Sequence, residues 1–136
     1  MKQLLITIAA LVLVGCGESQ QSAPANKSEP PTTEVSDISI HEAAKKGNIE
    51  AVKQHIAAGT DVNAQTRMGT PLFYAALMGH KEIAELLIIK GANVNAKLAT
   101  DETPLDNAIN HGHPETANLL RKHGGKTGEE LKAEGK

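Results

Sequence analysis

Residues 69–97 read GTPLFYAALMGHKEIAELLIIKGANVNAK, and this stretch decides the fold because it carries its own helix start and stop signals. Thr70 can cap the start of a helix, and Pro71 suits the first turn, where its missing N–H would have no partner. Gly79 ends this helix, because a left-handed residue is favoured there. The apolar residues between these signals recur at spacings of three and four, which places them on one helix face: Leu72, Ala75 and Ala76.

A second helix follows within the same stretch. It begins near Lys81, and Gly91 stops it. Its apolar residues show the same helical spacing: Ile83, Leu86 and Leu87. The polar turn ANVNA at 92–96 then leads onward, so the unit reads as helix, turn, helix and extended loop.

The unit recurs on both sides of this stretch. Thr-Pro-Leu and Gly-His both return 33 positions later, in ETPLDNAINHGHPETANLLRKHGGK from Glu102. An earlier copy, SIHEAAKKGNIEAVKQHIAAGTDVNAQ, starts near Ser39 without the Thr-Pro pair. Two glycines lie 12 positions apart in every copy: Gly47 and Gly59, Gly79 and Gly91, Gly112 and Gly124. Such periodicity indicates stacked repeats, here at about 38–65, 66–97 and 98–127.

These units resemble ankyrin repeats over about two-thirds of the chain. The resemblance implies an all-α solenoid of about three helix-turn-helix repeats with hairpin loops, at residues 37–128. The composition agrees, because Phe73 and Tyr74 are the whole aromatic inventory and 40% of the residues are hydrophobic. A core of Leu, Ile, Val and Ala favours closely stacked helices over a sandwich or barrel.

The chain departs from the family pattern at defined positions. The histidine usual after Thr-Pro-Leu is Phe73 in one repeat and Asp106 in the next, so its hydrogen bond to the threonine is expected to be absent or replaced. Asp101 stands where the second hairpin loop is expected to have glycine. The first copy opens with polar residues, as suits a terminal repeat that faces water. Residues 129–136 form a polar C-terminal tail that can add a short helix.

The N-terminus has the features of a bacterial lipoprotein signal. The apolar run at 4–14 would span only about 16 Å as a helix, about half of a hydrocarbon core of ~30 Å. Leu13-Val14-Gly15-Cys16 resembles the lipobox, which implies that residues 1–15 are a signal peptide and that Cys16 is lipidated. The alternative is an ordinary signal peptide followed by an idle thiol. Gly17, which is not aspartate, favours the outer membrane facing the periplasm over the inner membrane.

Residues 16–36 comprise the lipidated cysteine and a linker rich in Ser, Gln, Pro, Glu and Thr. Such a composition cannot bury enough apolar surface to offset its ordering entropy. We therefore predict a disordered linker that lets the folded domain stand off the membrane.

Several kinds of chemistry find no support in the sequence. The net charge is −2 and the sequence contains no block of like charges, so nothing indicates nucleic acid as a partner. GGKT at 124–127 has Leu120 where a phosphate loop needs glycine. The histidines are interpreted as structural rather than metal-binding, His55 as a satisfied, partly buried side chain. No Ser-His-Asp set is recognisable, so we predict no enzyme, no cofactor and no metal.

The resemblance places recognition on the concave face, formed by hairpin tips and the ends of the first helices. Leu77, Met78, Met68 and Leu98 are expected to form an apolar patch with lysines on one side. The alternative is that the tips fold over Leu77 and hide it. Carried over by position, the partner-binding residues are Lys45, Lys46, Thr66, Arg67, Met68, Leu77, Met78, Leu98, Ala99, Thr100, Asp101, Asn110 and His111.

The predicted function is protein–protein interaction by a monomeric lipoprotein of the bacterial cell envelope, anchored through Cys16. Three alternatives stay open from the sequence: an inhibitor or immunity-like protein of an envelope enzyme, a metal- or small-ligand-binding protein using His111, His113 and His123, and a structural spacer.

Overall fold

The computed structural model describes residues 38–136, which lie within one compact unit, Thr33–Lys136. The predicted signal peptide, Cys16 and the linker at 16–36 lie outside the described residues. None of the helices between residues 38 and 136 combines the length and the apolar character that a membrane crossing requires.

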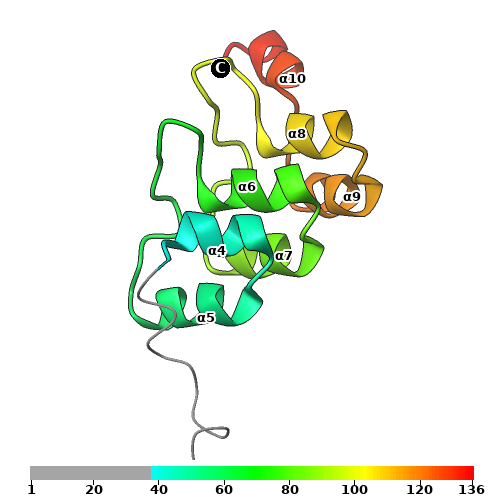
Figure 1. The fold of residues 1–136 in the computed structure, drawn as a ribbon. Coiled ribbons are helices and arrows are strands. Elements are labelled where there is room, and N and C mark those ends of the chain that lie inside the picture. Colours follow the sequence, from blue (N-terminus) through cyan, green and yellow to red (C-terminus); the bar gives the residue numbers. More distant parts are fainter. Residues whose placement is uncertain (1–37) are drawn as a thin grey trace, which may run out of the picture. The chain divides into compact units, whose positions relative to one another are not determined.

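The described residues form helices joined by turns and hairpin loops, and they contain one isolated β-bridge, between Thr66 and Gly69, but no strand. Figure 1 shows α4, α6 and α8 in one row and α5, α7 and α9 in a second row. This arrangement confirms the predicted all-α solenoid of three helix-turn-helix repeats. The helices are α4 (Ile40–Lys46), α5 (Ile49–Ala57), α6 (Pro71–Met78), α7 (Lys81–Ile89), α8 (Pro104–Asn110), α9 (Pro114–Lys122) and α10 (Gly128–Ala133).

The helix starts and stops follow the local signals in the sequence. The side-chain oxygens of Ser39, Thr70 and Thr103 accept the backbone N–H three residues on, at 3.2, 3.4 and 3.2 Å. Each bond satisfies one of the donors that a helix N-terminus leaves unpaired. Gly79 ends α6 with a φ of 75°, in the left-handed region. The predicted start of α6 after Thr70 and its predicted end at Gly79 are both confirmed.

The core consists of aliphatic side chains from both rows of helices. Fully buried alanines on the first helices allow neighbouring repeats to approach closely. Phe73 is buried and packs beside Gly69, whereas Tyr74 is half-buried. The largest fully buried aliphatic residues are Leu72, Ile83, Leu87, Leu105, Leu120 and Val52.

Asparagines in the hairpin bases connect successive repeats through backbone groups. Asn63 donates from Nδ2 to the Gly91 carbonyl at 3.0 Å and accepts from the Asn93 N–H at 2.7 Å. Asn95 makes the equivalent pair of bonds one repeat later, with Gly124 and Lys126, at 3.1 and 2.8 Å. These bonds attach the base of each hairpin loop to the turn that follows the second helix of the next repeat.

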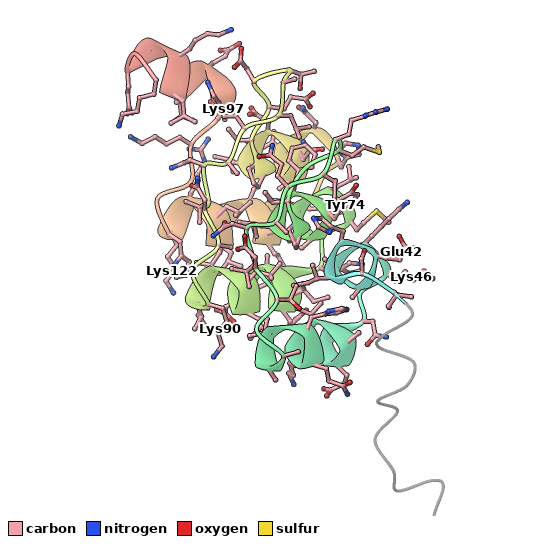
Figure 2. All side chains as sticks on the ribbon, turned by 90° about the vertical axis from the view of Figure 1, so that its left-hand side faces the viewer. Glu42, Lys46, Tyr74, Lys90, Lys97 and Lys122 are labelled. Atoms are coloured by element: carbon pink, nitrogen blue, oxygen red, sulfur yellow. The ribbon has the colours of Figure 1, made fainter. Side chains whose placement is uncertain are left out.

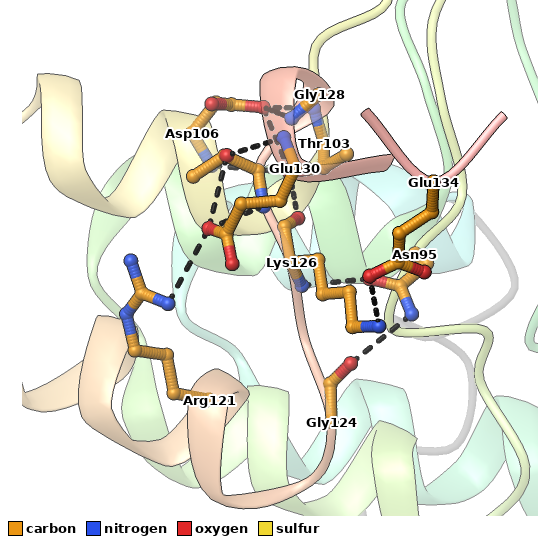
Figure 3. Close-up of polar contacts among 10 residues, drawn as sticks. Asn95, Thr103, Asp106, Arg121, Gly124, Lys126, Gly128, Glu130 and Glu134 are labelled. Carbon is orange, nitrogen blue, oxygen red and sulfur yellow. Dashed lines mark hydrogen bonds and ion pairs between the residues drawn. The ribbon is translucent and has the colours of Figure 1, made fainter. Parts of the chain in front are cut away.

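Asp106 replaces the hydrogen bond of the missing histidine, which is one of the two outcomes expected from the sequence. Its Oδ2 accepts from the backbone N–H of Thr103 at 2.9 Å and from the Thr103 hydroxyl at 2.8 Å. The same oxygen accepts from the Gly128 N–H at 2.8 Å, which ties α8 to the start of α10 (Figure 3).

Helix α10 lies largely within the predicted C-terminal tail and begins one residue before it. Thr127 and Glu130 cap its start reciprocally, and Leu131 is buried. Ion pairs join Arg121 to Glu130 at 3.4 Å and Lys126 to Glu134 (Figure 3). The tail is therefore packed against the last repeat, and its polar residues include the partners that hold it there.

Candidate functional site

A hollow of about 500 Å³ lies between α4, α6 and the tip of the first hairpin loop. We call it the first-repeat groove. Five predicted site residues line it: Lys45, Thr66, Arg67, Met68 and Leu77. The remaining lining residues were not predicted: Ser39, His41, Glu42 and Tyr74.

The hairpin tip of this groove is closed by paired backbone hydrogen bonds. Thr66 donates its N–H to the Gly69 carbonyl at 2.9 Å, and Gly69 donates back to the Thr66 carbonyl at 3.0 Å. The Thr66 hydroxyl also donates to the Gly69 carbonyl, at 3.0 Å. This tight turn presents Arg67 and Met68, and Met68 is 64% exposed.

Tyr74 and His41 join the two walls of the groove. Their rings meet edge to face, with centroids 5.9 Å apart and an interplanar angle of 81°. His41 Nε2 lies 2.7 Å from the Ala64 carbonyl, so the imidazole also ties α4 to the base of the hairpin. Both side chains are half-buried, which fixes the position of the Tyr74 ring while leaving part of it accessible.

Tyr74 was not among the predicted site residues. It occupies on α6 the position that Glu42 has on α4 and Asn107 has on α8. Asn107 is buried, and its Nδ2 has no hydrogen-bond partner among the described residues. The one available signal was that the chain's only tyrosine stands one turn before Leu77 on the same helix.

The groove carries cations that are not paired within the described residues. Glu42, the one acidic lining residue, pairs with Lys46 at 3.5 Å. Lys45 and Arg67 are exposed and form no ion pair with any residue between 38 and 136. Two free positive charges therefore stand beside the apolar surface of Tyr74, Leu77 and Met68.

The second hairpin tip is held by ion pairs of Asp101 with a lysine of the same loop and a lysine of α10. Asp101 has a φ of 69°, and it is the one residue other than glycine in the left-handed region between positions 38 and 136. Its carboxylate pairs with Lys97 at 3.1 Å and with Lys132 at 3.4 Å. The hydrogen bond and positive charge of Lys97, with those of Lys132, hold the pKa of Asp101 below its usual range. Asp101 thus fills the glycine-type position expected from the repeat pattern.

A separate hollow of about 210 Å³ lies between this hairpin, α8 and α10. Thr100, Asp101 and Asn110 line it, together with acidic residues such as Glu129. Leu98 is half-buried and lies outside both hollows, and its N–H donates to the Glu102 carbonyl at 3.0 Å.

Two of the four residues of the predicted apolar patch line the first-repeat groove. Met68 and Leu77 line the same groove, but Leu98 and Met78 do not. Leu77 is half-buried and Met78 is 44% exposed, so the hairpin tip does not hide them completely. Leu98 lies in the turn of the second hairpin, and one continuous patch of these four residues stays a prediction. Three further predicted residues are, like Met78, exposed and outside both hollows: Lys46, Ala99 and His111.

Four of the histidines contact backbone carbonyls of other elements, His41 among them. His55 Nε2 lies 2.8 Å from the Ile38 carbonyl, which confirms it as a satisfied, half-buried side chain. His80 and His113 make equivalent bonds to the carbonyls of Lys45 and Leu77, at 3.2 and 3.1 Å. Between residues 38 and 136 no three His, Cys, Asp or Glu side chains gather closely enough to hold a metal ion.

Figure 2 separates two sides of the repeat domain. Glu42, Lys46 and Tyr74 lie on the side of the first helices, whereas Lys90, Lys97 and Lys122 lie on the opposite side. The first-repeat groove opens on the former side, because Glu42 and Tyr74 line it.

Comparison with known proteins gives one family. The family model described as ankyrin repeats, in three copies, matches residues 40–130. Cyclin-dependent kinase 4 inhibitor B of Rattus norvegicus is 38% identical over 90 residues, which cover 65% of this chain and 69% of that protein. The human protein of the same name is 35% identical over 95 residues, with 69% of each chain covered. A putative ankyrin repeat protein of Rickettsia bellii (strain RML369-C) is 38% identical over 98 residues, 65% of this chain and 56% of that one.

These relatives are named as inhibitors or as repeat proteins, and the family is generally non-catalytic. The match spans all the described helices up to the start of α10, and it covers the three stacked helix pairs whose first helices are capped by Ser39, Thr70 and Thr103. The chain belongs to the ankyrin-repeat family, whose fold serves protein–protein interaction.

Proposed function

We propose that this chain is a lipid-anchored ankyrin-repeat protein of the bacterial cell envelope that binds another protein through the first-repeat groove and performs no catalysis. The observation that carries the proposal is the groove itself, where Tyr74 and Leu77 stand beside the unpaired cations Lys45 and Arg67. An accessible apolar surface with a charged rim is typical of protein interaction sites.

The groove is built in advance of any partner. The hairpin tip is closed by backbone bonds, and His41 fastens the hairpin base to α4. A partner would therefore dock on a formed surface, which limits the ordering entropy that binding costs.

The anchor is supported by the sequence alone. Cys16 is the only cysteine, and it completes the lipobox-like Leu13-Val14-Gly15-Cys16. Each acyl CH₂ buried in a bilayer contributes about 0.8 kcal/mol, so two or more chains hold a protein firmly. Gly17 favours the outer membrane, with the repeat domain in the periplasm.

Leu77→Asp is expected to abolish capture of the partner, because it puts a carboxylate on the apolar surface of the groove. The measurement is a cross-linked pull-down from membranes with the full chain, after circular dichroism has shown equal helicity. Met78→Asp is the matched control, since Met78 is the next residue, is 44% exposed and lies outside the groove.

A partner bound by the wild type and by Met78→Asp, but lost from Leu77→Asp, would place the interaction in the groove. Equal recovery with all three proteins would contradict that location. Recovery of no specific protein in any sample would favour the structural spacer.

Cys16→Ala is expected to release the protein from the membrane or to leave an uncleaved precursor, because no thiol remains to carry the acyl chains. Detergent-phase partitioning measures the first outcome, and gel mobility measures the second. Partitioning and mobility identical to the wild type would show that the anchor is not on Cys16.

A second candidate function is inhibition of an enzyme in the same compartment. Relatives that share 35–38% identity with the chain are named as inhibitors of cyclin-dependent kinase 4. Once a partner is recovered, its activity with and without the purified chain distinguishes an inhibitor from a scaffold. A fall in activity that Leu77→Asp prevents would establish inhibition.

A further inference from the structure

We infer that the first-repeat groove takes an extended segment of a partner protein in which an apolar side chain stands next to acidic residues. This inference rests on the proposed function and adds to it the chemistry of the partner.

The size of the groove favours a short segment. Its volume of about 500 Å³ falls within the ~300–1,000 Å³ typical of sites for small ligands. One apolar side chain with its neighbouring backbone suits such a space better than a whole helix face. Tyr74, Leu77 and Met68 supply the apolar contacts from two different elements, and methionine adapts to irregular shapes.

The charge of the groove favours an acidic segment. Lys45 comes from the last turn of α4 and Arg67 from the hairpin tip, so the two cations reach the groove from separate elements. Glu42 is the one carboxylate that lines the groove, and Lys46 already pairs with it. Arg67 can bind a carboxylate through two parallel hydrogen bonds, which adds orientation as well as attraction.

The second hollow, between the second hairpin, α8 and α10, would repel this segment. The second hollow is lined by Asp101, Glu102, Asp106 and Glu129, with Lys132 as its one lysine. Lys132 pairs with Asp101 at 3.4 Å, so its charge is already engaged. The acidic part of the partner therefore fits the first-repeat groove and not the second hollow.

The test is selection from a random peptide display library on the full chain, purified in mild detergent and immobilised. Peptides that combine an apolar residue with neighbouring Asp or Glu should be enriched on the wild type. Lys45→Glu/Arg67→Glu should lose these peptides and select basic ones instead. A selected acidic peptide should bind this variant about tenfold more weakly or worse, and added salt should weaken wild-type binding.

The matched control is Lys90→Glu/Lys122→Glu. It changes the net charge by the same amount, but both lysines lie on the opposite side of the domain (Figure 2). This variant should still select the acidic peptides. If it loses them as well, the preference reflects overall charge and the inference fails.

Two further outcomes of the peptide selection would also test the inference. Enrichment of peptides without acidic residues, or of none at all, would overturn the inference. The pull-down with Leu77→Asp reports separately on whether the groove binds a protein, so the proposed function can survive that result. Equal capture of the partner by the wild type and by Leu77→Asp would instead contradict the proposed function of the groove.

Discussion

Leu72→Ala is expected to lower the free energy of unfolding by about 3 kcal/mol, within the 2–5 kcal/mol range typical of a buried Leu→Ala change. Leu72 is fully buried on α6, the first helix of the central repeat. Helix α6 packs against both α4 and α8, so a cavity there weakens both interfaces between repeats. Three repeats are about the minimum for a stable solenoid, so the loss should affect the whole domain.

The measurement for Leu72→Ala is denaturant unfolding of the full chain, followed by circular dichroism. Ile89→Ala is the control, because Ile89 is also an aliphatic residue on a helix of the central repeat but is 68% exposed. We expect Ile89→Ala to change the free energy by less than about 0.5 kcal/mol. Similar losses for the two variants would mean that Leu72 is not part of a close-packed core.

Gly79→Val is expected to lower the free energy of unfolding by about 3 kcal/mol for two separate reasons. Gly79 has a φ of 75°, a conformation that costs an L-residue roughly 1–2 kcal/mol, and a β-branched one more. A Cβ at this position would also lie against the imidazole of His113. Displacing that ring breaks its hydrogen bond to the Leu77 carbonyl, which contributes about 1 kcal/mol.

Gly91→Val separates these two causes. Gly91 also has a positive φ, 100°, but a Cβ there would meet nothing within 4 Å. This variant should therefore show only the backbone strain of a β-branched residue, with a loss of about 2 kcal/mol. Thermal unfolding of both variants in parallel gives the difference. If Gly79→Val were no less stable than Gly91→Val, the contact with His113 would not contribute to the stacking of the repeats.

The lining of the first-repeat groove includes five of the site residues predicted from the sequence. Lys45, Thr66, Arg67, Met68 and Leu77 were expected to share one surface, and the structure brings them together. Tyr74 and His41 were missed because their meeting depends on the contact between two different repeats. Leu98 does not line the groove, since the turn of the second hairpin depends on how that loop closes.

Local patterns of residues were enough to predict the number of repeats and the ends of most helices. Thr70, Pro71 and Gly79 act through hydrogen bonds and backbone angles that span only a few residues, so their effect can be read locally. The 33-residue spacing between Thr70 and Thr103 then repeats the same local structure.

The charges that remain unpaired and the apolar side chains that meet depend on the packing of the repeats. Asp101 pairs with Lys132, 31 positions away, as well as with Lys97 in its own loop, and Asp106 binds Gly128, which lies 22 positions away. Lys45 and Arg67 find no such partner within residues 38–136, and this leaves the first-repeat groove basic. Contacts of this kind depend on the exact stacking of neighbouring repeats, which no local pattern of residues specifies.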